Sequence, residues 1–166
     1  MRQRQVFQGT RRAREFEAFV AGAAGRLLHT ATLLTAEAPD DNPRARRLLT
    51  LALAHTYACW DRLRGEDPYD RTRQHLALRF AHGAWRRHGV LLRGRTPDSP
   101  LSRLAPQERL ILVLRLYEGV AEEQAAALLG LPTERVHTIC DRATATLLHP
   151  PRGPAPAVVK AKVAAS

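Results

Sequence analysis

Several residue types are scarce in this chain of 166 residues, and each scarcity excludes a class of protein. Two cysteines are present, Cys59 and Cys140, too few and too far apart for a disulfide framework or a cysteine-ligated metal site. Aromatic residues make up 5% of the chain, so its cores must be built mainly from Leu, Ala and Val. No apolar run approaches the ~18 residues that span a membrane, and the N-terminus lacks the apolar segment of a secretory leader. The sequence therefore predicts a cytoplasmic protein with free thiols.

Motifs for catalysis and ligand binding are missing as well. The chain has no glycine-rich phosphate loop, no nucleophile elbow and no HExxH pair. Its seven histidines do not pair with cysteine or carboxylate residues at the spacing of metal ligands. The sequence thus predicts no enzyme, no cofactor and no metal site, and we expect a binding function instead.

The chain does carry a strong positive charge, +10 at neutral pH, and almost all of it comes from arginine. The charge is uneven, because residues 1–100 hold 18 arginines and 10 acidic residues, whereas residues 101–149 hold five arginines and six acidic residues. A basic balance indicates an anionic partner such as nucleic acid. Since the excess lies in the first 100 residues, the sequence argues against strong DNA binding by the C-terminal part alone.

Apolar residues recur at helical spacing in three segments of the first 88 residues. The first runs from Phe16 to near Glu37, the second starts at Pro43, and the third starts at Pro68 and ends near His88. Each proline suits the first turn of a helix, where no backbone N–H is needed. The positions expected to face inward are Phe16, Val20, Ala23, Leu27, Ala31, Leu34, Leu49, Leu53, Thr56, Trp60, Leu63, Leu76, Phe80 and Ala84. Three helices joined by short turns predict a compact bundle over residues 15–88.

Three further segments lack such periodicity. Residues 1–14 contain five arginines and no acid, so we expect a disordered basic arm. Residues 89–103 mix Gly, Pro, Ser and Arg and are typical of a linker between domains. Residues 149–166 are rich in Pro and Ala and bury too little apolar surface to order themselves, so we expect a disordered tail.

Residues 104–148 are the most informative part of the sequence. They predict three short helices, of which the first starts at Pro106 and the last is capped by Thr133. Gly130 permits the left-handed turn that separates the last two helices. The residues expected to face inward are Leu110, Val113, Leu114, Tyr117, Val136, Cys140, Ala143 and Leu147. This pattern is a helix-turn-helix, a motif that places one helix in the major groove of DNA.

The same periodicity gives the last helix an outward face, which consists of Glu134, Arg135, His137, Thr138, Asp141 and Arg142. Arginine, histidine and threonine side chains can contact base edges or phosphates, whereas the two carboxylates would oppose phosphate. The alternative is a plain three-helix scaffold, because small trihelical units with a glycine turn also occur in proteins that bind no DNA.

The ordered chain, residues 14–148, resembles the extracytoplasmic-function (group IV) RNA polymerase sigma factors, in particular their short two-domain actinobacterial members. Three segments carry the resemblance: FEAFVAGAAGRLLHTATLLTAEAP, RRLLTLALAHTYACWDRLRGEDPYDRTRQHLALRFAHGAWRR and LAPQERLILVLRLYEGVAEEQAAALLGLPTERV. Their order, lengths and aromatic positions agree with that family across both domains. Periodicity and resemblance together predict an all-α protein with an N-terminal three- to four-helix bundle, a linker and a C-terminal helix-turn-helix domain.

The resemblance also implies a division of labour. In the family, the N-terminal domain binds core RNA polymerase and melts the minus-10 promoter element, and the helix-turn-helix reads the minus-35 element. The positions implied to read the minus-35 element are Arg135, His137, Thr138 and Arg142. Those implied to capture the unstacked minus-10 strand are Arg79, Trp85, Arg86 and Arg87, and cationic grooves with aromatic stacking suit a single strand. Alternatively, Trp85 anchors the bundle, and Arg86 and Arg87 form a solvated helix end.

The chain also departs from the family pattern. Where the family has an acidic pair and a Gln that engage the polymerase clamp, this chain has Arg46 and Arg47 followed by Thr50, so the local charge is reversed. Arg79 replaces an Asn, and His137, Thr138 and Ile139 replace a Lys-Ser-Arg run. Ala105 and Ala121 stand where Ser or Thr usually cap a helix, and each lost cap costs about 1 kcal/mol. The face of Arg46, Arg47 and Thr50 is a candidate contact for polymerase or for an acidic partner.

The leading hypothesis is therefore a sigma factor-like transcription initiation protein whose partners are core RNA polymerase and promoter DNA. It needs no cofactor and no membrane, and an anti-sigma or other regulatory protein is a further candidate partner. One alternative is a sigma-like adaptor that binds a protein partner without acting as a sigma factor. The other is non-specific nucleic-acid binding through the basic arm.

Overall fold

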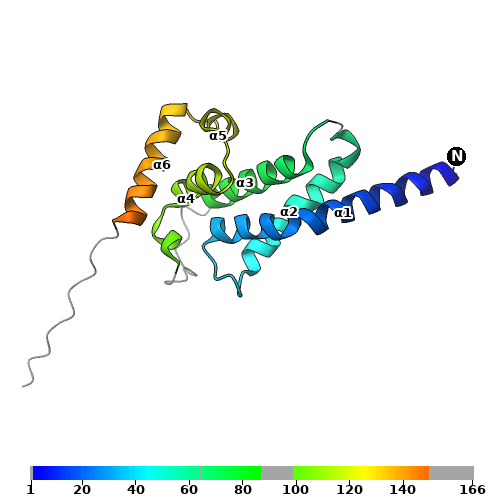
Figure 1. Ribbon diagram of the computed structural model, residues 1–166, viewed down its shortest axis with the longest axis horizontal. Coiled ribbons are helices and arrows are strands. Elements are labelled where there is room, and N and C mark those ends of the chain that lie inside the picture. Colours follow the sequence, from blue (N-terminus) through cyan, green and yellow to red (C-terminus); the bar gives the residue numbers. More distant parts are fainter. Residues whose placement is uncertain (1, 64, 87–98, 150–166) are drawn as a thin grey trace, which may run out of the picture.

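The computed structural model describes residues 2–63, 65–86 and 99–149, and in this part of the chain every regular element is a helix (Figure 1). The α-helices are α1 (Arg2–Thr35), α2 (Pro43–Cys59), α3 (Pro68–Arg86), α4 (Pro106–Leu112), α5 (Glu122–Leu129) and α6 (Thr133–Leu148). Shorter turns are the 3-10 helices η1 (Trp60–Arg62) and η2 (Pro100–Arg103) and the π-helical η3 (Val113–Tyr117). No strand occurs among the described residues, and the predicted all-α class is confirmed.

Helices α1, α2 and α3 pack against one another as the predicted N-terminal bundle (Figure 1). Their most buried apolar side chains are Leu27, Ala31, Leu34, Ala45, Ala52, Leu76 and Ala77. The many alanines let the helix backbones approach closely, which compensates for the shortage of aromatic side chains. Between α2 and α3 the buried hydroxyls of Thr56 and Thr72 lie 2.8 Å apart in a hydrogen bond, so these polar groups are satisfied inside the bundle.

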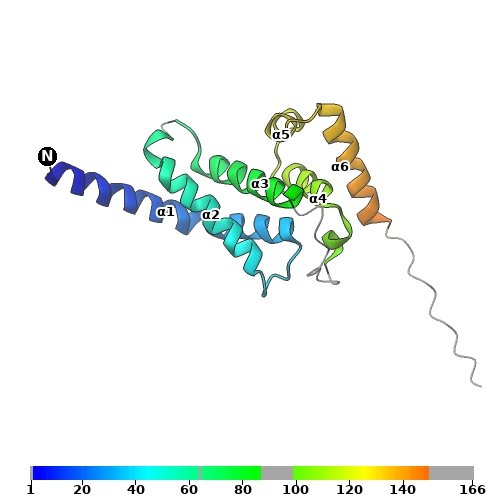
Figure 2. The same cartoon turned by 180° about the vertical axis from the view of Figure 1, so that it is seen from behind.

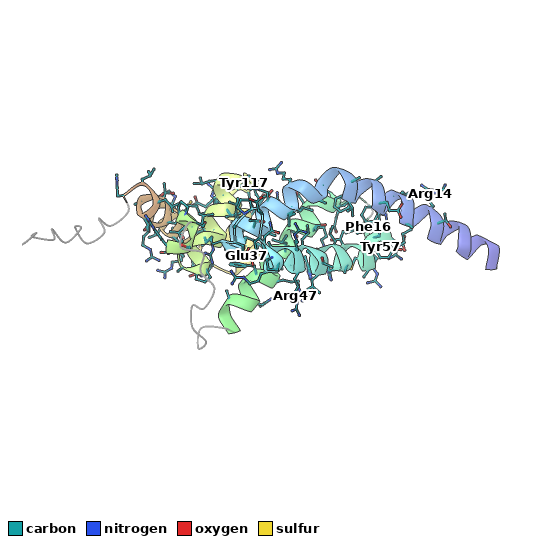
Figure 3. The ribbon with its side chains drawn as sticks, turned by 90° about the horizontal axis from the view of Figure 1, so that it is seen from below. Arg14, Phe16, Glu37, Arg47, Tyr57 and Tyr117 are labelled. Atoms are coloured by element: carbon teal, nitrogen blue, oxygen red, sulfur yellow. The ribbon has the colours of Figure 1, made fainter. Side chains whose placement is uncertain are left out.

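Helix α1 begins far earlier than the sequence predicted. It starts at Arg2, so the expectation of a disordered arm over residues 1–14 is wrong for residues 2–14, which continue the helix. The first turns of α1 project beyond the bundle (Figure 2). Contacts further along the helix fix the direction of this projection. The Arg12 guanidinium lies 4.3 Å from the Tyr57 ring centre and pairs with Asp61 at 3.1 Å. The Phe16 ring packs on Tyr57 at 4.9 Å between ring centres (Figure 3).

The start of α2 is capped by a residue from outside the helix. Asn42 occupies the cap position, but its side chain makes no capping bond and instead donates to the carbonyl of Pro39 at 2.7 Å. The Glu37 carboxylate accepts the backbone N–H groups of Arg44 at 3.1 Å and Ala45 at 2.8 Å. Burial alone would raise the pKa of Glu37, but the hydrogen bonds from Ala45 and Arg44 outweigh it and lower this pKa. Glu37 therefore joins the end of α1 to the start of α2.

The second unit consists of η2, α4, η3, α5 and α6 and contains the predicted helix-turn-helix. Gly130 has φ +65° and ends α5 in the left-handed conformation, as the sequence predicted. The core of the second unit contains Leu110, Ile111, Leu114, Val120, Ala125, Ala126, Val136 and Ile139, all buried. Helix α6 packs on both α4 and α5, so its opposite face is left to solvent.

Three sequence-based details of this unit are wrong. Tyr117 was expected inside but is 37% exposed, because it is the last residue of the π-helical turn η3, whose wider turn shifts the helical register. Thr133 does not cap α6, since it is the first helical residue and Pro132 holds the cap position. The segment 89–103 is not a linker throughout. Residues 99–103 include η2, which contacts α6 and places Leu101 against the cluster of Leu104, Leu112 and Ala143, while residues 89–98 lie outside the described chain.

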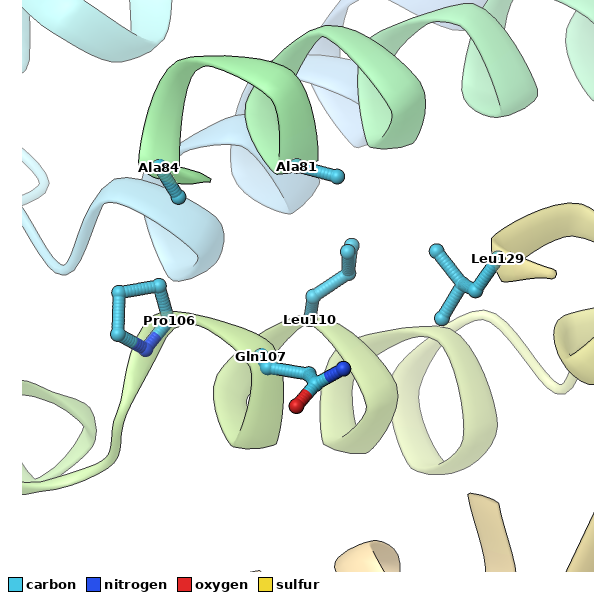
Figure 4. Close-up of a pocket in the computed structure, with 6 residues that line it drawn as sticks. All are labelled: Ala81, Ala84, Pro106, Gln107, Leu110 and Leu129. Carbon is cyan, nitrogen blue, oxygen red and sulfur yellow. The ribbon is translucent and has the colours of Figure 1, made fainter. Parts of the chain in front are cut away.

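The two units share one continuous hydrophobic core. Helix α4 contacts both α1 and α3, and α5 contacts α3. Figure 4 shows a small apolar pocket at this interface, where two alanines of α3 face α4. The residues that line it are Ala81, Ala84, Pro106, Gln107, Leu110 and Leu129. The small side chains of Ala81 and Ala84 leave this pocket within the shared core.

A buried carboxylate lies at the same interface. Glu118 follows η3, and its side chain is 0% exposed. Its carboxylate accepts a hydrogen bond from Thr30 Oγ1 and lies 3.0 Å from Tyr69 Oη, measured from each oxygen. Arg26 and Arg73 approach it to 3.5 and 3.6 Å. Burial, together with the adjacent Glu118 charge, raises the pKa of Tyr69 to about 12, so its hydroxyl remains a donor throughout the physiological range.

Candidate nucleic-acid and partner interfaces

The outward face of α6 is exposed, as the helical spacing predicted. Glu134, Arg135, His137, Thr138, Asp141 and Arg142 are all accessible to solvent. Val136, Ile139 and Ala143 face the core and hold the helix in place. Ile139 was not recognised as a core residue from the sequence, although it lies three residues from Val136 and four from Ala143, the spacing of one helical face.

Acidic neighbours occupy part of this face. The His137 imidazole lies between two carboxylates, with Nδ1 3.3 Å from Glu122 and Nε2 3.2 Å from Asp141. Glu122 also lies 3.6 Å from Arg115. The Thr138 hydroxyl donates to the backbone carbonyl of Glu134 at 2.8 Å. A DNA contact through the His137 ring nitrogens, or one in which the Thr138 hydroxyl donates, therefore requires these local interactions to be exchanged.

Arg142 is bound in the same way by Glu108. Its Nε and Nη2 atoms both lie 2.8 Å from Glu108 Oε1, while Oε2 of the same carboxylate accepts the N–H of Ala105 at 2.8 Å. The second contact is half of a capping box, which explains how α4 begins without a Ser or Thr cap. Glu108 thus fixes the start of α4 and neutralises one arginine of the α6 face.

Arg135 differs from the other cations of this face. Its guanidinium is exposed, and no hydrogen bond or ion pair ties it to another side chain in the described part of the chain. An exposed guanidinium has the planar donor geometry that recognises guanine in the major groove. Arg135 is therefore the predicted contact residue whose donors can be offered to DNA without breaking an existing pair.

The minus-10 residues are described only in part. Arg79 is exposed on α3. The backbones of Trp85 and Arg86 belong to the last turn of α3, their side chains fall outside the description, and Arg87 falls outside it altogether. The structure therefore leaves the proposed strand-binding role of Trp85, Arg86 and Arg87 as a prediction.

The same helix carries a histidine contact that the sequence analysis missed. The rings of His75 on α3 and His55 on α2 stack at 3.7 Å with an interplanar angle of 1°. Burial lowers the pKa of His75 to about 4, helped by the nearby His55, Arg79 and Arg71. The two residues are twenty positions apart, and only the packing of α2 on α3 brings them together.

The third predicted face lies on α2. Arg46, Arg47 and Thr50 are all exposed on one side of the helix (Figure 3 labels Arg47). Arg46 Nε donates to Asn42 Oδ1 at 2.8 Å, and the Thr50 hydroxyl donates to the carbonyl of Arg46 at 2.9 Å. The helix contains no acidic residue. This face is therefore positively charged, in contrast to the α6 face.

Comparison with known proteins gives these surfaces a context. Residues 101–148 match the family model of sigma-70, region 4. The RNA polymerase sigma-E factor of Streptomyces coelicolor is 28% identical over 152 residues, a match that covers 80% of this chain and 84% of that protein. The RNA polymerase sigma-E factor of Streptomyces avermitilis is also 28% identical over 152 residues, covering 80% and 83%. The chain is a divergent relative of the extracytoplasmic-function sigma factors. No solved structure matches this chain.

The residues that match region 4 agree with the helices of this protein. The match begins at Leu101, inside η2, and ends at Leu148, the last residue of α6. It therefore includes the η2 residues that pack on α6, which is why the linker predicted over 89–103 extended too far. Among the helices that the structure describes, none is long and apolar enough to span a lipid bilayer.

Proposed function

We propose that this protein initiates transcription by binding core RNA polymerase and promoter DNA, as a binding factor without catalytic activity of its own. The observation that carries the proposal is the agreement between the region 4 match and the helix-turn-helix of α5 and α6, whose outer face is exposed. The similarity to the two sigma-E factors over 80% of the chain extends the argument to the N-terminal bundle.

Within this function each exposed face has a separate task. Helix α6 enters the major groove of a minus-35 type element, with Arg135 as its main base contact and His137, Thr138 and Arg142 in support. The end of α3, with Arg79, Trp85 and Arg86, holds the unpaired strand of the minus-10 type element together with Arg87, the next residue in the sequence. The α2 face of Arg46, Arg47 and Thr50 binds polymerase, and its charge requires an acidic surface on that partner.

Co-elution with purified core RNA polymerase, followed by run-off transcription from a cognate promoter, tests this proposal. The full chain should co-elute and support transcription, whereas core polymerase alone should not initiate at that promoter. Arg135→Ala should weaken promoter binding by about 1–3 kcal/mol, the discrimination that one bidentate base contact provides. Failure to co-elute would refute the polymerase role, and unchanged promoter binding by Arg135→Ala would refute the assignment of the base-reading residue.

A second candidate function is a sigma-like adaptor that binds an acidic protein through α2. Two observations favour it: the exposed α2 face has reversed charge, and the α6 face is neutralised by Glu108, Glu122 and Asp141. An adaptor would fail the co-elution and run-off assays and would still bind an acidic partner through Arg46 and Arg47. Arg47→Glu would abolish that binding, with the chain's binding to DNA as the internal control.

A further inference from the structure

The amino arm of α1, residues 2–14, is strongly cationic. It contains five arginines and no acidic residue, and α1 continues through all of it as one helix. The first turns of this helix project beyond the bundle (Figure 2). Like charges on one helical segment repel each other, so a segment of this composition favours an anionic partner.

Arg12 anchors the arm to the bundle and is already occupied. Its guanidinium pairs with Asp61 at 3.1 Å, donates to the backbone carbonyl of Tyr57 and lies 4.3 Å from the centre of the Tyr57 ring. One turn further along, the Phe16 ring packs edge-on against Trp60 with 5.2 Å between ring centres. These contacts tie the arm to the end of α2, so it meets a partner as a helix of fixed direction.

Arg11 and Arg14 are the exposed arginines next to this anchor. The Arg14 side chain forms no hydrogen bond or ion pair within the described part of the chain (Figure 3 labels Arg14). Arg11 pairs with Glu15 at 2.7 Å, one turn along the same helix, and the Arg11 side chain remains 82% exposed. Exposed pairs of this kind are weak and exchange readily for another anion. Two guanidinium groups are therefore available to a partner.

We propose that Arg11 and Arg14 bind the phosphate backbone of double-helical DNA, as a third DNA contact of the protein beside α6 and the end of α3. This inference rests on the proposed function, because it adds a contact to the promoter complex. The contact reads no bases, since arginine–phosphate pairs position a protein on DNA without carrying sequence information.

The surface of the arm suits DNA better than another protein. Its described and exposed residues are Gly9, Thr10, Arg11 and Arg14, none of which has a large apolar side chain. A protein interface has a buried centre that is apolar and poor in charge. Binding to the DNA backbone is instead largely electrostatic and uses arginine and lysine. The described part of the arm offers charge without an apolar centre, so its complement is a row of phosphates.

The arm also lies apart from the end of α3 that is proposed to hold the unpaired strand. Asp61, which anchors Arg12, belongs to η1 between α2 and α3, so the arm leaves the bundle near the start of α3. The 19 residues of α3 span about 28 Å, which equals about eight base pairs at 3.4 Å each. The target of the arm is therefore the duplex that flanks the unpaired strand.

Binding of the full chain to a short duplex of random sequence tests this contact without polymerase or a promoter. Fluorescence anisotropy over a series of salt concentrations gives the slope of log affinity against log salt. The double variant Arg11→Gln with Arg14→Gln should make this slope less negative by about 1.8, because each lost phosphate contact removes about 0.9. Between about 50 and 200 mM salt, the wild-type chain should therefore lose ~12-fold more affinity than the double variant.

Three controls make the result specific. Arg103→Gln removes the same charge from an exposed position on η2 and should leave the slope unchanged. Arg11→Lys with Arg14→Lys keeps two phosphate-binding charges and should retain the wild-type slope. Circular dichroism should show equal helicity, since glutamine and arginine have similar helix propensities. An unchanged slope in the glutamine variant, or an equal change in Arg103→Gln, overturns the proposal.

Assays with core polymerase separate failure of the arm from failure of the function. If the chain initiates transcription but the glutamine variant keeps the wild-type slope on random DNA, the function holds and the arm contact is refuted. If the chain never binds polymerase but the variant still flattens the slope, the DNA contact is supported and the function fails. A variant that binds DNA normally but loses polymerase would assign the arm to an acidic protein surface and overturn the DNA contact.

Discussion

Glu108→Gln tests how strongly the α6 face is neutralised by its own domain. In the wild-type chain one carboxylate oxygen binds two nitrogens of Arg142 at 2.8 Å and the other accepts the Ala105 N–H at 2.8 Å. Glutamine retains an acceptor for the backbone of α4 but has no charge to hold Arg142. The substitution should therefore release Arg142 towards DNA while it preserves the start of the helix.

The structure sets the size of the expected effect. Because the Arg142 side chain is 63% exposed, its pair with Glu108 contributes only about 0.2–1 kcal/mol to stability, and the melting temperature should change little. One additional phosphate contact makes the slope of log affinity against log salt more negative by about 0.9. Between 50 and 200 mM salt, this slope change corresponds to an extra ~3.5-fold loss of affinity.

Fluorescence anisotropy with a promoter duplex, measured over a series of salt concentrations, gives this slope directly. The control is a double-mutant cycle in which Glu108→Gln is combined with Arg142→Ala. In the Arg142→Ala background Glu108→Gln should leave the slope unchanged. An equal gain in both backgrounds would mean that only the net charge matters, and the proposed release of Arg142 would be refuted.

Two further predictions concern stability. Stability should fall as the pH drops from about 6.5 towards 4, because the unfolded chain takes up a proton at His75 in this window, whereas burial keeps the pKa of the folded residue near 4. Urea unfolding at several pH values should show this decline, His75→Gln should reduce it, and a flat wild-type profile would contradict it. Glu37→Ala should lower the free energy of unfolding by about 1–3 kcal/mol, because the N–H groups of Arg44 and Ala45 lose their acceptor. The exposed Glu123→Ala is the matched control, and an equal loss in both variants would count against the capping role of Glu37.

The parts of the fold that local signals determine could be predicted from the sequence. Pro43, Pro68 and Pro106 each occupy the first residue of a helix, and Gly130 ends α5 with a positive φ. These signals depend on backbone geometry at one residue, so they hold without knowledge of the neighbouring helices. The outward face of α6 could be predicted too, because helical periodicity is also a signal within one segment of the chain.

Features that depend on tertiary contacts were missed or placed wrongly. Nothing near Glu118 in the sequence indicates partners as distant as Thr30, 88 positions away. The π-helical turn η3 moved Tyr117 outward, and no local signal marks such a turn. Residues 2–14 contain no apolar stripe, yet they extend an established helix, and propagation of a helix is far easier than its nucleation. Glu122, which pairs with His137, and Glu108, which binds Arg142, likewise come from other helices, α5 and α4.

The continuous α1 has a practical consequence for experiments. Its 34 residues form a rod of about 50 Å, and the first twelve or so extend about 20 Å past the aromatic contacts around Phe16. A fluorescent protein or affinity tag fused at this end is held away from the surfaces of α2, α3 and α6. Fusions should therefore be made at the amino end, where a bulky reporter leaves these three surfaces open to large assemblies.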